Sequence, residues 1–309
     1  MVPAFGAAPE AELVAVASRS EEKAHATAEK HGIPRSFGSY DALLADPEIE
    51  AVFLPLPNDQ HAHWAKKALL AGKHVLCDKP MTLSAEDAEA NAALALERNL
   101  RLMEGFMFRF HPQHTRVKEL ISSGAIGEVK RFEASFCYPA TPDRTNIRWN
   151  KSQGGGALLD VGVYGISAAR FFLGEPTEGH IFQNIEPESG VDIASLATFV
   201  FPGGVLASVA CSFTEAFAST YTLIGTEGAI TAERAFQIGE SGVNLRNRAH
   251  NADEESVEFF PHMDSYALEI SHFSACVRDP HKSLQPGEDG VAQARAVGLI
   301  TTGLPPCPR

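Results

Sequence analysis

The sequence has no excess of basic residues: 26 lysines and arginines stand against 39 aspartates and glutamates, for a net charge of −13. Nucleic acids bind basic surfaces, so this balance argues against a nucleic-acid partner. No apolar run approaches the ~20 residues that a membrane-spanning helix needs. The N-terminus also lacks the basic and then apolar stretch of a signal peptide. We therefore expect a cytoplasmic protein with neither nucleic acid nor membrane as a partner.

Cysteine is scarce, and the five cysteines never form a C-x-x-C pair; they lie at positions 77, 137, 211, 276 and 307. Their odd number and wide scattering favour reduced thiols over a disulfide framework or a zinc site. The histidine pairs His61/His63 and His111/His114 bring neither a carboxylate nor a cysteine at a ligand spacing. We therefore expect no metal site.

The chain also lacks the G-x-G-x-x-G turn of a dinucleotide-binding domain, and the run "GGGA" at 154–157 neither follows a strand nor has that spacing. The first apolar run, "ELVAVASRS" at 12–20, predicts a buried strand that ends in Ser18-Arg19. Such an ending is typical of a second strand, so we expect an N-terminally truncated chain. The first strand and its glycine turn, ~25 residues of a βαβ unit, would be missing, leaving a central sheet edge unpaired. At the other end, residues 298–309 break off a helical pattern early, and we expect an altered C-terminus.

What is present is an alternation of apolar runs and helical patterns between residues 12 and 130. Strict alternation of strand and helix predicts a Rossmann-like α/β domain with a doubly wound parallel sheet. Beyond about residue 127, strands with alternating apolar residues are joined by Pro-Gly, Gly-Gly and Glu-Gly turns, which predicts a mostly antiparallel open-faced sheet. We place the incomplete dinucleotide-type domain at residues 1–110 and an α+β domain at residues 111–309.

Ligands of such folds bind at the carboxyl ends of the parallel strands, and three predicted strand ends carry notable residues. Arg19 follows the first strand, where an arginine favours the 2′-phosphate of NADP, although a solvated arginine opening a helix is an equal alternative. Asn58 and His61 follow the second strand and would flank the crevice, although an ordinary helix-capping turn also accounts for Asn58. Lys79 ends the third strand and precedes Pro80, which holds it in an extended conformation aimed into the crevice. The alternative there is a surface lysine in a turn.

In the second domain, a helix predicted over residues 157–173 carries Asp160 and Tyr164, four residues apart and therefore on one face. A tyrosine beside a lysine can transfer a proton to or from a substrate oxygen, with the carboxylate orienting it. The alternative is a structural aspartate and a tyrosine at the edge of the core.

Three stretches carry a resemblance to a known family: "LCDKPMTLS" at 76–84, "MEGFMFRFHPQ" at 103–113 and "GGGALLDVGVYG" at 154–165. In this order and at these separations, the chain resembles the Gfo/Idh/MocA oxidoreductase family over roughly residues 3–300. Within the family it is most similar to the branch of glucose–fructose oxidoreductase, NADP-dependent D-xylose dehydrogenase and dihydrodiol dehydrogenase. Asp78 stands where the family usually has glutamate.

The resemblance implies that Lys79 and Tyr164 are the proton-transfer groups beside the substrate oxygen and that Asp160 orients them or the substrate. It implies NADP rather than NAD as the cofactor. The expected cofactor-binding residues are Ser18, Arg19, Pro55, Asn58, His61, Lys79, Arg148 and Trp149. The expected substrate-binding residues are Phe108, Arg109, Asp160 and Tyr164.

The function implied by the resemblance is hydride transfer between nicotinamide and a hydroxyl or carbonyl carbon of a sugar or dihydrodiol. The enzyme would be a homodimer or homotetramer formed through the open sheet face. One alternative is a catalytically inactive family member that acts as a sensor or binding module, because the glycine-rich loop is absent. Another is an enzyme that uses bound NAD for non-redox group removal.

Overall fold

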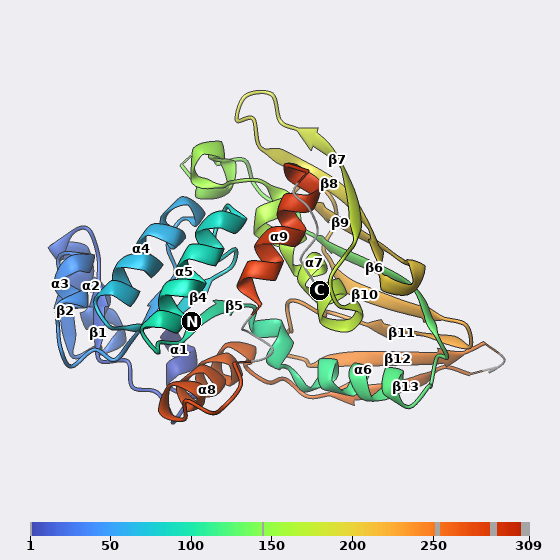
Figure 1. Cartoon of the computed structure of the whole chain (residues 1–309), viewed down its shortest axis with the longest axis horizontal. Coiled ribbons are helices and arrows are strands. Elements are labelled where there is room, and N and C mark those ends of the chain that lie inside the picture. Colours follow the sequence, from blue (N-terminus) through green and yellow to red (C-terminus); the bar gives the residue numbers. More distant parts are fainter. Residues whose placement is uncertain (1, 144, 251–253, 285–288, 304–309) are drawn as a thin grey trace.

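The computed structural model describes residues 2–143, 145–250, 254–284 and 289–303, and Cys307 lies outside them (Figure 1). The first half of the chain alternates short parallel strands with helices. Its elements are α1 (Val2–Phe5), β1 (Ala15–Ala17), α2 (Glu21–His31), β2 (Arg35–Phe37), α3 (Tyr40–Leu44), β3 (Ala51–Leu54), α4 (Asn58–Leu70), β4 (His74–Asp78), α5 (Ala85–Glu97) and β5 (Leu102–Gly105).

These parallel strands form two sheets in the described part of the chain, β1–β2 and β3–β4–β5. The alternation of strand and helix that the sequence predicts is confirmed. The first apolar run is not the fully buried strand that was expected. Ala15, Val16 and Ala17 of β1 are each half-buried, whereas Val75, Leu76 and Cys77 of β4 are buried. Among the described residues, β4 is a central strand paired with β3 and β5, whereas β1 pairs with β2 alone.

The second half is built on an eight-stranded sheet in the order β13-β12-β11-β10-β6-β9-β8-β7. Its strands are β6 (Val129–Cys137), β7 (Glu178–Ile185), β8 (Asp192–Phe201), β9 (Val205–Ser212), β10 (Ala218–Gly225), β11 (Gly228–Ala232), β12 (Val243–Ala249) and β13 (Ser256–Phe260). Only β6 and β9 pair in parallel, so the prediction of a mostly antiparallel sheet is confirmed.

One face of this sheet is covered by α7 (Val163–Leu173), which approaches it closely. Gly165 makes that contact possible, since a Cβ there would lie 2.5 Å from Val209 Cγ1 and 3.2 Å from Ala134 Cβ. The helix does not begin as the regular α-helix that was expected, because residues Leu158–Gly162 form a π-helical turn. The segment Lys151–Leu173 is long and apolar enough, by length and composition only, to cross a membrane. It serves as a core helix, because 72% of its apolar window is buried inside the protein.

The chain passes between the halves through η1 (Met107–Phe110) and α6 (Pro112–Ser122), and it returns at its end with α8 (Ser265–Arg278) and α9 (Gly290–Thr301). Helix α9 contacts α5 of the first half and α7 and β7 of the second (Figure 1). Helix α8 contacts α1 and η1. The last two helices together therefore contact elements of the first half, of the second half and of the connection between them. Lys79, at the carboxyl end of β4, lines the same cleft as Tyr266 of α8.

Candidate active site

A cleft with a volume of about 1060 Å³ opens where the carboxyl end of β4 meets the large sheet and α7. Its lining combines charged, aromatic and amide side chains from both halves of the chain. Among the residues that line it are Asp78, Lys79, Met107, Phe136, Tyr138, Arg148, Trp149, Asp160, Tyr164, Gln237, His262 and Tyr266. The three residues predicted to carry the chemistry, Lys79, Asp160 and Tyr164, are thus brought together.

Lys79 is placed by the last residue of β4 and by the π-helical turn opposite. Its backbone N–H donates to Asp78 Oδ1 (2.8 Å), and the Lys79–Pro80 peptide bond is cis. Its Nζ donates to the carbonyl oxygen of Asp160 (2.6 Å) and lies 3.5 Å from Asp160 Oδ1. A π-helical turn departs from the i to i+4 hydrogen bonding of an α-helix, and here a carbonyl of that turn accepts from the lysine.

The Asp160 carboxylate is the centre of the hydrogen bonds at the cleft. Its Oδ2 accepts from the Tyr138 hydroxyl (2.7 Å) and from Arg148 Nε (2.8 Å). Burial alone would raise the pKa of Asp160, but the nearby charges of Lys79 and Arg148 hold it below its ordinary value. Asp160 is therefore an anion at neutral pH, and its Oδ2 accepts hydrogen bonds from two donors.

Tyr164 lies deep in the cleft with its ring enclosed by other aromatic rings: Phe106, Phe108, Phe136 and Phe236. Its hydroxyl donates to Met107 Sδ at 3.7 Å, and Lys79 Nζ lies 5.3 Å from its ring centroid. Burial, followed by the nearby Tyr266 and Asp78, raises the pKa of Tyr164 well above its ordinary value. The phenol is therefore protonated at neutral pH, and because a thioether is a weak acceptor, a substrate oxygen would be a better partner.

Two residues expected in the substrate pocket do not line the cleft. Arg109 is buried, with Nη1 donating to Asp289 Oδ1 (2.7 Å) and Nη2 to the Ser167 carbonyl oxygen (3.1 Å). Phe108 is fully buried against the rings of His114 and Tyr164. The reason is the tight turn of η1, which directs Met107 to the cleft and the next two side chains into the interior. Neither Phe108 nor Arg109 is among the described residues that line the cleft, and the contact of these two residues with substrate stays a prediction.

The residues expected to bind the cofactor lie in two groups. Lys79, Arg148 and Trp149 line the cleft, and Trp149 packs on Phe213 with ring centroids 5.8 Å apart. Ser18, Arg19 and Pro55 lie at the ends of β1 and β3 and are not among the residues that line it.

Asn58 and His61 begin helix α4 and connect the two groups. Asn58 Nδ2 donates to the Gly154 carbonyl oxygen (2.8 Å), and His61 Nδ1 bonds the Pro80 carbonyl oxygen (2.7 Å). Since a carbonyl only accepts, His61 carries a proton on Nδ1, and its buried Nε2 has no hydrogen-bond partner among the described residues.

The expected cofactor residues fit the two ends of a dinucleotide: Arg19 its phosphate-bearing ribose, and the residues that line the cleft its nicotinamide. Helix α4 starts after Pro57 with no side chain capping its first turn, so its free N–H groups and positive end face the carboxyl edge of β3. Arg19 is exposed at the end of β1, where an extra phosphate could reach its guanidinium. The unpartnered Nε2 of His61 adds a polar atom at the same edge.

The most prominent cleft residue missed by the sequence reasoning is Tyr138. It follows β6 directly and precedes Pro139, so it is a polar aromatic at a strand end, the same kind of signal that singled out Lys79. Gln237, His262 and Tyr266 were also missed. Gln237 and His262 come from loops and Tyr266 from the first turn of α8, and the approach of these segments to β4 depends on the packing of the whole second half.

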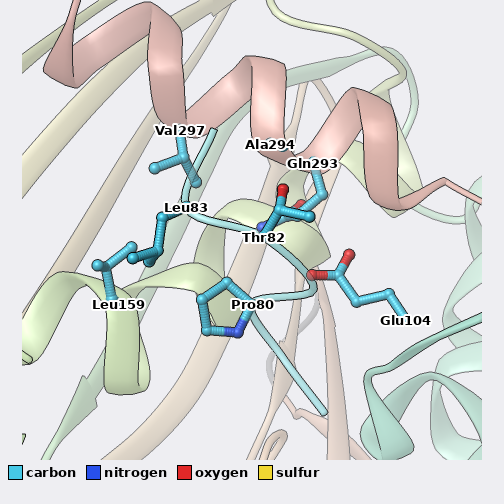
Figure 2. A pocket seen from close by; sticks show the side chains of 8 residues that line it. All are labelled: Pro80, Thr82, Leu83, Glu104, Leu159, Gln293, Ala294 and Val297. Atoms are coloured by element: carbon cyan, nitrogen blue, oxygen red, sulfur yellow. The ribbon is translucent and has the colours of Figure 1, made fainter. Parts of the chain in front are cut away.

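Other buried titratable groups lie outside the cleft. The Glu104 carboxylate accepts from the Met81 N–H (2.9 Å), and burial raises its pKa to about 7. Figure 2 shows the loop with Pro80, Thr82 and Leu83 passing beneath α9, with the Glu104 carboxylate turned toward it. Within the described ranges no group of three His, Cys, Asp or Glu side chains gathers in a way that would hold a metal ion.

Comparison with known protein families matches two models, which together span most of the chain. Residues 2–106 match an oxidoreductase family with an NAD-binding Rossmann fold. Residues 114–231 match the GFO/IDH/MocA C-terminal domain.

Individual relatives cover nearly the whole chain. A D-xylose 1-dehydrogenase (NADP(+)) from Haloferax volcanii is 35% identical over 97% of this chain and 91% of its own length. A dTDP-3,4-didehydro-2,6-dideoxy-alpha-D-glucose 3-reductase from Actinomadura kijaniata is 37% identical over 98% of this chain and 90% of its own. The crystal structure of KijD10, a 3-ketoreductase from Actinomadura kijaniata in complex with NADP and TDP-benzene, superposes with a TM-score of 0.90 at 35% identity, covering 98% of this chain and 93% of that one.

Proposed function

Because the chain belongs to the Gfo/Idh/MocA oxidoreductase family, we propose that it transfers a hydride between NADP and a hydroxyl- or carbonyl-bearing carbon of a sugar or dihydrodiol. The observation that carries the proposal is the convergence of Lys79, Asp160 and Tyr164 on one cleft. The relatives named as an NADP-dependent xylose dehydrogenase and a sugar-nucleotide reductase support both the reaction class and the cofactor.

The cofactor supplies the hydride chemistry when bound, and the chain's residues supply position and a proton. The Tyr164 hydroxyl is protonated, and its hydrogen-bond partner in the described structure is the Met107 thioether. This hydroxyl donates its proton to a substrate carbonyl oxygen or takes a proton back from a substrate hydroxyl. Lys79 places its ammonium beside the same ring, where it stabilises negative charge on the oxygen. Asp160 fixes Lys79 and offers an anionic acceptor to a further substrate hydroxyl.

In this proposal, residues 1–110 bind the dinucleotide and residues 111–309 bind the substrate, and the protein works in the cytoplasm. Arg19 would hold the 2′-phosphate of NADP, with the first turn of α4 at Asn58 and the His61 ring along the edge of the crevice. Arg148 and Trp149 would close the nicotinamide end of the cleft.

The test is a fluorescence titration of NADPH followed by rate assays with aldoses, ketoses and dihydrodiols in the presence of NADP. We expect saturable NADPH binding and reduction of NADP with at least one member of the panel. Binding without turnover of any member would point to the inactive sensor, an alternative that the named enzymes among the relatives do not favour. Group removal without net cofactor reduction would point to the non-redox alternative.

We further propose that the open face of the eight-stranded sheet packs against a second copy of this chain in a homodimer or homotetramer. Three large apolar side chains stand exposed there on neighbouring strands: Phe182 (65%), Leu196 (44%) and Leu206 (55%). Phe182 and Leu196 are directly paired across β7 and β8, and Leu206 lies further along the same face, opposite Val200. Exposed apolar residues gathered on one face are typical of an interaction surface. Light scattering should give a multiple of the 33.2 kDa chain mass, and Phe182→Asp together with Leu206→Asp should reduce it to one.

A further inference from the structure

Tyr138 is held rigidly at the rim of the cleft by the strand that precedes it. Its N–H donates to the Ser212 carbonyl oxygen (3.0 Å), which extends the pairing of β6 with β9 by one residue. Its ring packs on Phe213 with centroids 5.5 Å apart. The backbone and the ring are thus fixed independently of the hydroxyl, which reaches 2.7 Å to Asp160 Oδ2.

The two oxygens of the Asp160 carboxylate have unequal surroundings. Oδ2 accepts two short hydrogen bonds, from the Tyr138 hydroxyl and from Arg148 Nε, whereas among the described residues Oδ1 has only the Lys79 ammonium, at 3.5 Å. A carboxylate held at one oxygen by two donors cannot rotate without breaking both bonds. The other oxygen is then left with spare acceptor capacity at the cleft that Asp160 lines.

We propose that Tyr138 is a positioning residue: it locks the Asp160 carboxylate so that Oδ1 accepts a hydrogen bond from a substrate hydroxyl neighbouring the reacting carbon. The proposal rests on the proposed function for the identity of the substrate as a polyol. It assigns a specificity role to the Tyr138 hydroxyl, since a substrate without that neighbouring hydroxyl would leave Oδ1 unpaired.

The charges around Asp160 make the role measurable. The titratable and charged groups that face it are Lys79 from β4, Arg148 from the turn at Ile147–Trp149, Tyr138 from the end of β6 and Tyr164 from α7. Burial and the negative charge of Asp160 raise the pKa of Tyr138, so its hydroxyl is a donor throughout the working pH range. Removing that donor should raise the pKa of Asp160 by about one unit.

The test uses Tyr138→Phe, which keeps the ring on Phe213 and deletes only the hydroxyl. Tyr266→Phe is the matched control for the titration, because Tyr266 lines the same cleft and its hydroxyl makes no hydrogen bond to Asp160 in the described structure. Carboxyl-¹³C aspartate is incorporated, the Asp160 signal is assigned with Asp160→Asn, and the signal is followed against pH in the ligand-free protein.

We expect the Asp160 titration to move up by about one unit in Tyr138→Phe and to stay in place in Tyr266→Phe. With the sugar that the panel identifies, kcat/KM of Tyr138→Phe should fall about 10-fold, mainly through KM, with its acid limb moved in parallel. An unchanged Asp160 titration in Tyr138→Phe, or an equal shift in Tyr266→Phe, overturns the proposal. A shift confined to Tyr138→Phe with no turnover of any substrate by the wild type supports the positioning of Asp160 and overturns the proposed function instead.

Discussion

Two networks of charged side chains in this protein each centre on one aspartate bound by two cationic side chains, and they differ in how far those cations are exposed. In the cleft network, the Asp160 carboxylate binds Lys79 and Arg148. In the sealed network, the Asp289 carboxylate binds Arg109 (2.7 Å) and Arg170 (3.0 Å). The arginine side chains of the sealed network are 1% exposed, whereas Arg148 in the cleft network is 42% exposed.

The two networks differ in whether their polar atoms are used within the protein or remain available to a ligand. In the sealed network, Arg170 also donates to Glu175 and to Gln293 of α9, and Gln293 donates in turn to the Val163 carbonyl oxygen of α7. The ion pairs and hydrogen bonds of this network hold η1, α7 and α9 together. In the cleft network, Asp160 Oδ1 and the Tyr164 hydroxyl retain capacity for a ligand. Loss of a cleft charge should therefore change turnover, and loss of a sealed charge should change stability.

The largest expected effect is on turnover in Lys79→Ala. Removing the ammonium beside Tyr164 should lower kcat by about 10²–10⁴-fold, while the thermal unfolding temperature changes little because Asp160 keeps Arg148 and Tyr138. Initial rates and a melting curve measure the two quantities, with Lys130→Ala, an exposed lysine on β6, as the control. Turnover in Lys79→Ala close to that of the wild type would contradict the assignment of the cleft as the active site.

The next effect in size is the loss of stability in Arg109→Met. Asp289 would lose one of its two buried cations, and breaking a buried ion pair costs about 3–5 kcal/mol of the free energy of unfolding. Urea unfolding followed by circular dichroism measures it. A tenfold rise in KM at an unchanged free energy of unfolding would instead assign Arg109 to substrate binding. The sealed network would then not be purely structural.

Glu104, at the border of the sealed network, should make stability depend on pH. Burial, together with the nearby Asp289, raises its pKa to about 7 from the ordinary 4.5, so between these values the unfolded chain is ionised and the folded protein is not. Folding then binds an extra proton, and the free energy of unfolding should fall by about 3 kcal/mol as the pH rises from 4.5 to 7. Glu104→Gln keeps an acceptor for the Met81 N–H and should remove this decline, as urea unfolding at several pH values would reveal. An equally steep decline in the variant would assign it to another group.

The smallest effect is expected at the edge of the sealed network, in Glu175→Gln. Glu175 holds Arg170 with two hydrogen bonds of 2.7 and 2.8 Å, but its side chain is 36% exposed. Arg170 also retains Asp289, so the loss should be about 1 kcal/mol at low salt and smaller in 1 M NaCl. A loss as large as that of Arg109→Met, independent of salt, would show that the sealed network extends to its rim.

The sequence could predict Lys79, Asp160 and Tyr164 because each is set by local structure: a strand end before a proline, and two positions on one helix. It could also predict both sheet types from strand alternation and turn residues. It did not predict the burial of Arg109 and Phe108 away from the cleft lining, because neighbouring residues in the tight turn of η1 face different surroundings, which no periodicity records. It missed Tyr138 because the partner of its hydroxyl, Asp160, comes from a distant segment that only tertiary packing brings within reach.

The return of α8 and α9 to the first half has a consequence for how this protein is made. Leu76 and Met103 of the parallel sheet complete their apolar cluster with Phe273 and Cys276 of α8, at least 170 residues further along the chain. On the ribosome, the half that is synthesised first therefore remains open on this side until nearly the whole chain has emerged. Contacts of such long sequence separation slow folding, so we expect this apolar cluster to form late.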